Sequence, residues 1–411
     1  MTTLRNGKQT SIQPVVVEEN EIQIIVQHWT RILHIKFGWI NEFYKLVANY
    51  VMLFFVTAFF IFDTFRSSSK LLKTFDTNIS SVYSIDYSTI YGLQLLCSAG
   101  DNIVCVWDIE TNQQIQSFNG HSDLVSCVKF SQYHYHNYHQ NIICSSSGDK
   151  TICFWDFKHN RQLQIFNGHT EWIGGIEFSP FYGGRYLCSG SGDKTIRLWD
   201  VETFKSLHIF NGHTNVVRCI DISSLQSNNK NENKINDIGV IGGNGYTICS
   251  GSYDNTIRIW DIETAKRLTV FKGHENWIIS VKYGSNELLN TILSGSFDKS
   301  VRLWDIRSDQ QIQTFKGHTS FVNIVEYSPF IIKNSDKAVG GNSNVICSGS
   351  YDNTIRFWDI RSNKKELYVI KKDNKKYDEI YCLKFIQFKK NEKRNVNLYY
   401  GSSDGIIYVW R

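Results

Sequence analysis

The chain has 411 residues, of which 42% are hydrophobic and 20% are charged, and it contains only three prolines. This composition excludes a disordered or collagen-like protein and is sufficient for a large buried core. The 44 lysines and arginines exceed the 39 aspartates and glutamates by only five, which is weak beside the basic stripe of a nucleic-acid-binding domain. Ten cysteines without a CxxC pair exclude a disulfide scaffold, so we expect reduced thiols in a cytoplasmic or nuclear protein.

The chain begins with a region that differs from the rest. The first ten residues contain no apolar stretch of the kind found in secretory signals, and we expect residues 1–20 to be disordered. From Glu21 to Leu46 apolar side chains recur at helical spacing, and we expect a helical segment over residues 21–66. Residues 46–62 carry no charge, and this length is at the lower limit of a membrane span. Two interpretations stay open: a helix buried against the protein or a partner, and a membrane anchor with the remainder in the cytosol.

From residue 70 onward the sequence repeats. Seven tryptophans each follow an aspartate by six positions, and five of the seven units open with a Gly-His pair. Segments such as DKTIRLW alternate apolar and polar side chains with the period of a strand, directly after a turn. Each unit therefore predicts four short strands. The aspartate and tryptophan pairs are Asp101 and Trp107, Asp149 and Trp155, Asp193 and Trp199, Asp254 and Trp260, Asp298 and Trp304, Asp352 and Trp358, and Asp404 and Trp410.

These units resemble the WD-repeat (WD40) family over residues 70–411. The resemblance implies an all-β fold, a seven-bladed β-propeller preceded by the α-helical extension. Because the chain ends one residue after its last tryptophan, the seventh blade lacks an outer strand. Residues 70–75 match the outer strands at 161–166 and 205–210, so we expect them to pair with the last blade and close the ring.

The resemblance also assigns roles to the recurring polar residues. The loop histidine, a strand serine, the aspartate and the tryptophan of one blade are implied to form a buried hydrogen-bonded chain. We expect a structural role, since a hydrolase does not need its triad five times. The complete sets are His121, Ser145, Asp149 and Trp155; His169, Ser189, Asp193 and Trp199; His213, Ser250, Asp254 and Trp260; His274, Ser294, Asp298 and Trp304; His318, Ser348, Asp352 and Trp358.

Two blades depart from this pattern, the first and the seventh. Asn78 stands in the histidine position of the first, and Tyr400 replaces the serine of the seventh. We expect these two blades to be the least stable. The sequence has neither a nucleotide-binding fingerprint nor an unrepeated acid and base pair, so we expect no enzyme activity, no cofactor and no catalytic residues.

Other reactive side chains have structural explanations. Four cysteines lie five residues before a blade aspartate, and this periodicity indicates core residues. The group His134, His136 and His139 lies in an insertion, where metal ligation is an alternative to an exposed polar loop; we expect no metal. The cysteines are Cys144, Cys188, Cys249 and Cys347.

In WD40 propellers the opening loop of each blade and the turn before its aspartate meet on one face. Large side chains at these positions are candidates for binding a protein or peptide, because aromatic residues and arginine dominate interfaces. The alternative is that the aromatic side chains pack on one another and seal the face. The candidates are Tyr83, Trp172, Arg218, Tyr253, Trp277, Phe297, Phe321, Tyr351 and Tyr381.

Two further resemblances suggest partners. The WDIR sequences ending at Arg307 and Arg361 resemble a box of cullin-RING ligase substrate receptors, which implies contact of both arginines with a ligase adaptor; the alternative is an arginine that closes a turn. The blades also resemble the WD-repeat subunit of histone methyltransferase complexes, which clamps an arginine between phenylalanines. Phe297 and Phe321 match, but Asn323 departs from that pattern. RNA binding through the lysine-rich 364–394 is a further alternative, and we expect a monomeric propeller within a larger complex.

Overall fold

The computed structural model describes residues 60–90, 93–223, 246–284, 288–332, 344–362, 366–371, 379–390 and 393–411. They belong to one compact unit that extends to Arg411. Residues 1–59 lie outside the described residues. This range includes residues 1–20, which we expect to be disordered, and most of the helical segment expected over 21–66. No helix of the described part is long and apolar enough to cross a membrane, and 46–59 are outside that part.

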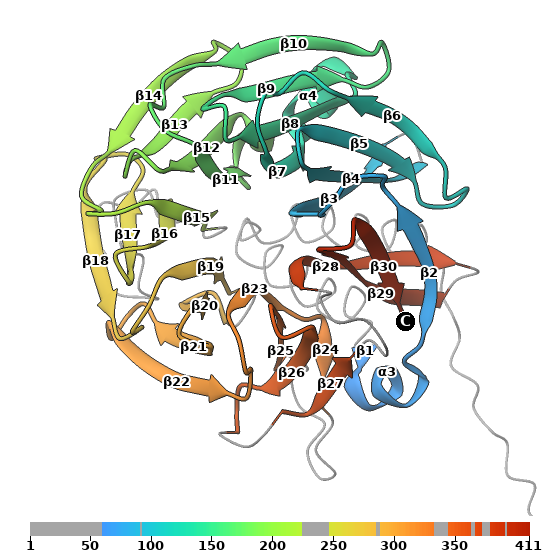
Figure 1. Ribbon diagram of the computed structural model, residues 1–411. Helices are drawn as coiled ribbons and strands as arrows, with labels where there is room; N and C mark the ends of the chain where they lie inside the picture. Colours follow the sequence, from blue (N-terminus) through green and yellow to red (C-terminus); the bar gives the residue numbers. More distant parts are fainter. Residues whose placement is uncertain are drawn as a thin grey trace, which may run out of the picture. The chain divides into compact units, whose positions relative to one another are not determined.

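Seven antiparallel four-stranded sheets are arranged around a common centre, as Figure 1 shows, and this confirms the seven-bladed β-propeller. Each of the first three blades is built from four consecutive strands. Blade 1 contains β3 (Ser84–Ile90), β4 (Leu93–Gly100), β5 (Ile103–Asp108) and β6 (Gln114–Phe118). Blade 2 contains β7 (Val125–Phe130), β8 (Ile142–Ser147), β9 (Ile152–Asp156) and β10 (Arg161–Phe166). Blade 3 contains β11 (Ile173–Phe178), β12 (Tyr186–Ser191), β13 (Ile196–Asp200) and β14 (Lys205–Phe210).

The next three blades repeat this order, from the innermost strand to the outermost. Blade 4 contains β15 (Val217–Ile222), β16 (Thr247–Ser252), β17 (Thr256–Asp261) and β18 (Arg267–Lys272). Blade 5 contains β19 (Ile278–Tyr283), β20 (Thr291–Ser296), β21 (Ser300–Asp305) and β22 (Gln310–Lys316). Blade 6 contains β23 (Val322–Tyr327), β25 (Val345–Ser350), β26 (Thr354–Asp359) and β27 (Tyr368–Lys371).

Blade 7 joins the two ends of the propeller. Its inner strands are β28 (Ile380–Lys390), β29 (Lys393–Ser402) and β30 (Ile406–Trp410), and its outer strand is β2 (Leu71–Asp76). Phe75 pairs with Ile407 in the antiparallel register of β2 and β30. Sequence analysis expected residues 70–75 to close the ring. Because β2 pairs with β30, β30 is not left as an open edge.

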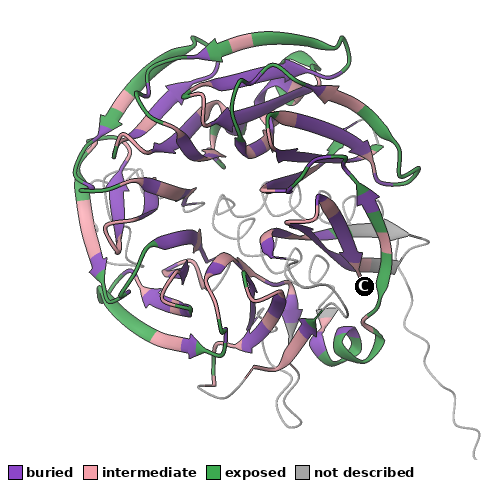
Figure 2. Ribbon diagram, in the orientation of Figure 1, coloured by how far each residue is buried: buried purple, intermediate pink, exposed green. Residues whose placement is uncertain are grey.

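Burial follows the radial position of a strand. Figure 2 shows the middle strands almost entirely buried, whereas the outer strands are mostly exposed or half-buried, with a buried residue near one end. On β10, for example, Leu163 and Ile165 are exposed while Phe166 is buried. Hydrophobic clusters form between neighbouring blades rather than at one centre, so each blade is stabilised mainly by the blades beside it.

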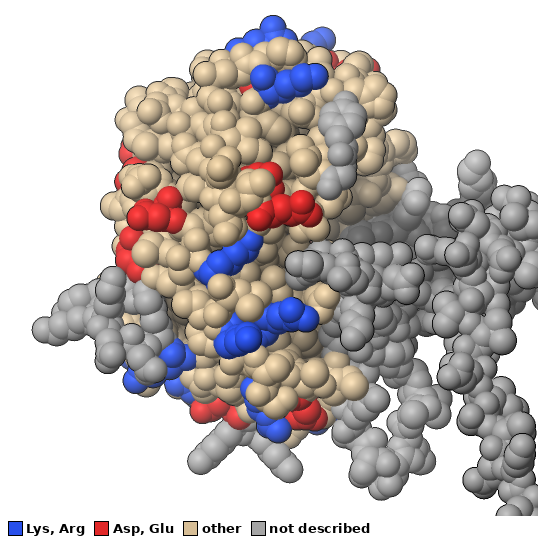
Figure 3. Space-filling model, turned by 90° about the vertical axis from the view of Figure 1, so that its right-hand side faces the viewer, with Lys and Arg blue, Asp and Glu red and all other residues tan. Residues whose placement is uncertain are grey.

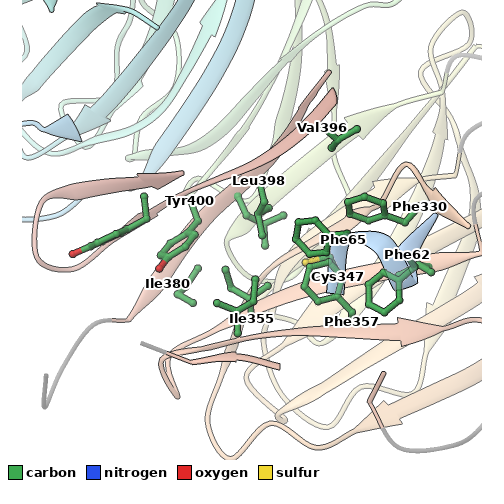
Figure 4. Packing of buried hydrophobic residues seen from close by; sticks show 14 residues of the cluster. Phe62, Phe65, Phe330, Cys347, Ile355, Phe357, Ile380, Val396, Leu398 and Tyr400 are labelled. Atoms are coloured by element: carbon green, nitrogen blue, oxygen red, sulfur yellow. The ribbon is translucent and has the colours of Figure 1, made fainter. Parts of the chain in front are cut away.

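The described end of the N-terminal segment packs on the propeller. Phe60 and Ile61 form a short strand, β1, parallel to β24 (Phe330–Ile331), and α3 (Phe62–Ser68) follows it. Figure 4 shows Phe62 and Phe65 between the side chains of blades 6 and 7. The ring centroids of Phe65 and Phe330 are 4.6 Å apart. Sequence analysis kept open the burial of residues 46–62 against the protein, but it named no contacts, because neither phenylalanine belongs to a repeat.

Two insertions form regular structure. The histidine-rich insertion of blade 2 contains a short helix, α4 (Gln132–Tyr138), in place of the polar loop that we expected as the alternative to a metal site. The lysine-rich insertion prolongs the hairpin of β28 and β29, which pair as far as Lys390 and Lys393. A single-turn helix, η1 (Tyr182–Gly184), lies between the first two strands of blade 3.

The hydrogen-bonded chain implied by the resemblance is present in blades 2 to 6. In blade 4 the indole Nε1 of Trp260 donates to Ser250 Oγ over 2.8 Å, and this oxygen lies 2.8 Å from His213 Nε2. Because the Asp254 carboxylate can only accept, His213 Nδ1 donates to it over 2.8 Å, and in the neutral ring Nε2 then accepts the proton of Ser250. Burial lowers the pKa of His213, which favours this neutral tautomer.

The serines of these five chains are fully buried, with 0% exposure of Ser145, Ser189, Ser250, Ser294 and Ser348. A nucleophile must be reachable by its substrate, so this geometry favours the structural role for all five sets. The four cysteines that follow the same periodicity are also fully buried and carry no disulfide.

The first and seventh blades keep only parts of the chain. In blade 1 Trp107 donates to Ser98 over 3.0 Å, but Asp101 accepts from Ser80 instead of a histidine. In blade 7 the ring of Tyr400 occupies the serine position, and the buried indole nitrogen of Trp410 has no hydrogen-bond partner among the described residues. An unsatisfied buried donor costs about 1 to 3 kcal/mol.

We predict that native-state hydrogen exchange opens blades 1 and 7 before the others. Their middle strands, β4, β5, β29 and β30, lack the complete chain, so their opening free energy should lie at least about 1 kcal/mol below that of blades 2 to 6. Mass spectrometry of peptic fragments measures the protection of each blade. Equal protection of all seven blades would contradict this expectation.

Candidate functional site: the loop face

The two ends of the propeller carry different connections. Because successive strands of a blade are antiparallel, the opening loop of a blade and the turn between its second and third strands lie at one end. We call this end the loop face. The turn between the third and fourth strands lies at the other end, which we call the opposite face.

The histidine chains position the side chains of the loop face. Trp277 lies three residues after His274, and Phe297 lies directly before Asp298, whose carboxylate accepts from that histidine over 2.7 Å. The backbone N–H of Phe297 also donates to the carbonyl of Trp277 over 2.9 Å. Blade 6 repeats this arrangement, with Tyr351 N–H donating to the carbonyl of Phe321 over 2.9 Å. The loop and the turn of each blade are thus held side by side.

Six of the candidate side chains form a continuous row across blades 3 to 6, which we call the aromatic row. Successive ring centroids are 6.4, 4.2, 5.2, 3.8 and 5.7 Å apart. Two of these contacts are parallel stacks, with interplanar angles of 9° and 8°. In order, the members are Trp172, Tyr253, Trp277, Phe297, Phe321 and Tyr351.

The row is both packed and accessible. Tyr253 and Trp277 stack on one another, and so do Phe297 and Phe321, yet Trp277 keeps 39% of its surface exposed and Tyr351 keeps 43%. The sequence left two interpretations open, mutual packing of the rings and a surface that binds a partner. The two are compatible, because one side of a ring can pack while the other stays exposed. Stacking fixes their orientation, and the outer surface stays open to a partner.

The other loop-face candidates lie beside the row. The Arg218 guanidinium stands 6.0 Å from the centroid of Trp172 and donates to the carbonyl of Gly174. Tyr83 and Tyr381 form a separate pair across blades 1 and 7, with centroids 4.9 Å apart. Seven of the nine loop-face candidates thus form one group, and these two tyrosines form another.

The WDIR arginines lie on the opposite face. Both follow the third strand of their blade, β21 or β26, at the turn away from the aromatic row. Arg361 makes a two-pronged ion pair with Asp359, at 3.0 and 3.1 Å. The exposed side chain of Arg307 forms no ion pair with any described residue. Sequence analysis did not assign the two arginines to a face, and the structure places them at the end of the propeller away from the aromatic row.

A ring of seven charged side chains lies behind the loop face. The innermost strands of all seven blades line a central cavity of about 150 Å³. Each contributes one charged residue at an equivalent register position, paired with the second strand at or beside its cysteine position. In order around the ring these are Asp86, Lys129, Glu177, Asp221, Lys282, Glu326 and Lys384. These charged residues recur at one position of the repeat and can be identified in the sequence, although sequence analysis did not identify them.

An odd number of positions prevents complete alternation of charge. The one like-charged pair of neighbours is Glu177 and Asp221, and Lys282 stands 3.8 Å from the first and 3.7 Å from the second. Lys129 also pairs with Glu177, over 2.6 Å. Burial raises the pKa of Asp221 to about 6, with Lys282 opposing this shift and Glu177 adding to it.

The described residues offer no metal site. His134 is largely buried, its Nδ1 lies 2.7 Å from Ser131 Oγ, and burial lowers its pKa to about 4. No group of three potential ligands occurs in the part of the chain that the structure describes. On the side drawn in Figure 3, basic and acidic side chains are interspersed among uncharged residues and form no continuous basic stripe.

We predict that Asp221→Asn stabilises the protein at neutral pH. The pKa of Asp221 is raised above its usual 3.8, so its favourable contribution is complete below pH 3.8 and is lost as pH rises through about 6. The asparagine removes this loss, which amounts to roughly 3 kcal/mol by the size of the shift. Urea denaturation at pH 4 and pH 7.5 should show a gain only at the higher value.

Glu177→Gln is the matched control for this experiment. Burial alone would raise the pKa of Glu177, but Lys129 and Lys282 lower it, so its charge is favourable and its loss should destabilise the protein at pH 7.5. If Asp221→Asn destabilised the protein as much as this control does, our interpretation of the charge ring would be wrong.

Comparison with known proteins agrees with the architecture. The profile of the WD40 family (WD domain, G-beta repeat) matches six stretches, 69–108, 112–156, 160–200, 204–261, 265–305 and 309–359. Cell division control protein 4 from Saccharomyces cerevisiae is 33% identical over 135 residues, which are 31% of this chain and 17% of that protein. Each matched stretch joins the outer strand of one blade to three strands of the next. Since these stretches cover more than half of the sequence, the chain belongs to the WD40 repeat family.

Proposed function

We propose that this WD40 propeller is a non-catalytic scaffold that docks a protein or a peptide on its loop face. The aromatic row carries this proposal. WD40 propellers are in general interaction scaffolds, and the row places six large rings where partners would approach. The ten cysteines, none of them in a disulfide, support the further proposal that it works in a reducing compartment, the cytoplasm or the nucleus.

The packing within the row favours binding. Tyr253 and Phe321 are held by neighbouring rings on their flanks, so they lose little freedom when a partner covers them. Trp277 and Tyr351 offer large apolar surfaces with few rotatable bonds, the property that makes such residues frequent at interaction hot spots.

We predict that replacing Trp277, Phe297 and Phe321 with alanine abolishes partner binding at little cost in stability. All three side chains are at least partly exposed, so the melting temperature should fall by no more than a few degrees. Affinity purification from cell lysate followed by mass spectrometry compares the partners of both forms. A large fall in melting temperature would show that these rings serve packing alone.

The matched control replaces three exposed apolar residues of outer strands, Leu163, Ile165 and Ile312, with alanine. It removes exposed apolar side chains on the outer rim of the propeller, away from the aromatic row, and should keep every partner. Equal loss of partners in both variants would refute docking on the loop face.

A ligase-receptor role is the second candidate, and one observation favours it. Arg307 is exposed on the opposite face without an ion pair to a described residue, so its guanidinium is available to an acidic group of an adaptor. Arg361 already engages Asp359. The interaction would therefore depend mainly on Arg307.

We predict that Arg307→Ala removes a ligase adaptor from the purified complexes and that Arg361→Ala weakens its recovery less. The measurement is quantitative mass spectrometry of the partners that are still recovered with the alanine variant of Trp277, Phe297 and Phe321. Recovery of the adaptor unchanged by Arg307→Ala, or its absence from the wild-type complexes, would contradict this role.

The chromatin-subunit alternative gains no support from the candidate clamp. The rings of Phe297 and Phe321 stack with centroids 3.8 Å apart, so a guanidinium does not fit between them. Asn323 points its amide to the carbonyl of Ile380, over 3.0 Å. A role in a histone-modifying complex would need another recognition site.

A further inference from the structure

A cleft on the opposite face, between blades 3 and 4, has no part in the proposed docking on the loop face. It has a volume of about 250 Å³. Its walls come from the loop around η1 in blade 3, from the start of β16 and from the turn after β17 in blade 4. Four phenylalanine and tyrosine rings line it, together with the imidazole of His208. The four rings are Phe181, Tyr182, Tyr186 and Tyr246.

The four rings form a corner rather than a flat stack. Tyr182 stands nearly perpendicular to Phe181, at 82° and 5.8 Å, and to Tyr186, at 89° and 6.0 Å. Phe181 also contacts Tyr246, with centroids 3.7 Å apart. Perpendicular aromatic walls present ring faces from several directions, which is the arrangement that surrounds a cation well.

The backbone is shaped to present Tyr182. Its φ of 49° lies in the left-handed region, and the two glycines after it follow with φ of 64° and 86°. This conformation is uncommon for a bulky side chain. The result is that 69% of the Tyr182 surface is exposed at the mouth of the cleft.

A buried carboxylate adds negative charge. Asp261 is only 4% exposed and lines the cleft; its Oδ1 accepts from the backbone N–H of Glu263 and Thr264, over 2.8 and 3.2 Å. No described residue donates to its Oδ2. In four other blades this second oxygen has a side-chain partner at 2.7 to 3.1 Å, and the equivalent aspartates are Asp156, Asp200, Asp305 and Asp359.

The charge balance of the cleft favours a cation. Its described lining contains the carboxylates of Asp261 and Glu263, the imidazole of His208, and no lysine or arginine. The nearby Arg185 is already paired with Asp200 at 2.8 Å and with Glu202 at 2.7 Å, and it lies over the ring of Tyr186. The guanidinium of Arg185 therefore already contacts one ring of this aromatic group, that of Tyr186.

The lining selects among cations. A primary ammonium carries three N–H donors, and ring faces offer no lone pairs, so only the donors that reach the carboxylates of Asp261 or Glu263 would be satisfied. A methylated ammonium keeps the charge and presents methyl groups, which ring faces contact favourably. Leu198 and the exposed Leu207 extend the apolar wall, where the alkyl stem of a lysine would lie.

We propose that this cleft binds the methylated ammonium group of a trimethyllysine side chain presented by a partner protein. The rings of Tyr182, Tyr186 and Tyr246 surround the methyl groups, and Asp261 Oδ2 balances the charge. This inference is independent of the loop face, and its failure would leave the proposed docking function untouched.

The test is an NMR titration of the full chain with ¹³C-labelled tyrosine. Four probes are compared: Nα-acetyl-trimethyllysine amide, the unmodified lysine equivalent, a neutral analogue with a tert-butyl group in place of the trimethylammonium, and tetramethylammonium chloride. Shifts of the Tyr182, Tyr186 and Tyr246 signals report occupancy. We expect trimethyllysine to bind about tenfold or more tightly than the lysine and the neutral analogue.

Variants locate the site and separate charge from shape. Tyr182→Ala should lose binding and Tyr182→Phe should keep it, because the ring face makes the contact. Asp261→Asn should weaken binding severalfold while keeping the Oδ1 acceptor of the turn. Its matched control is Asp305→Asn, the same turn in blade 5, which should bind as the wild type does. Melting curves confirm that each variant is folded.

The outcomes divide cleanly. Equal affinity for the neutral analogue would show a plain apolar cleft, and equal affinity for unmodified lysine would show an unselective acidic site; either overturns the proposal. Tetramethylammonium binding as tightly as trimethyllysine would assign the cleft to free quaternary ammonium compounds and overturn the lysine source. Absence of shifts in the three tyrosines would overturn the site itself.

Discussion

The hydrogen bond between the loop histidine and the turn aspartate is the contact on which the loop face depends. It joins two segments that are 24 residues apart in blades 3 and 5 and 41 apart in blade 4. The aromatic side chains project from these same segments, three residues after the histidine or one before the aspartate. Although burial alone would raise the pKa of Asp254, the hydrogen bond from His213 holds it well below its usual range, so the bond persists at physiological pH. A feature that looks catalytic in the sequence therefore fixes the geometry of the binding surface.

Repetition explains why the fold could be predicted and why its exceptions could not. Seven units with one spacing define seven blades, and a single register places Trp277, Phe297 and Phe321 together although they are far apart in sequence. Phe62 and Phe65 have no counterpart in other units, so nothing in the pattern pointed to their contacts with Phe330 and Phe357. The cleft of blades 3 and 4 was missed for the same reason, since Tyr182 and Tyr246 lie in connections that differ between blades.

The two ends of the propeller use aromatic side chains in different ways. On the loop face the rings stack in parallel pairs and offer one extended surface, which suits a peptide or a protein. In the cleft near η1 the rings meet at steep angles around a carboxylate, which suits one compact cation. The same residue types thus imply different ligands, and only their relative orientation, which composition does not contain, separates the two cases.

The central charges follow from the number of blades. With an even number, acids and bases could alternate around the ring without conflict, but seven positions force at least one like-charged pair. Here the conflict falls on Glu177 and Asp221, and Lys282 lies between them at 3.8 and 3.7 Å. Glu326, by contrast, has no ion pair with any described residue, because its basic neighbours turn toward other acids. In a ring with an odd number of charges, the repulsion between like charges is therefore confined to a few residues. Here Glu177 adds to the effect of burial in raising the pKa of Asp221.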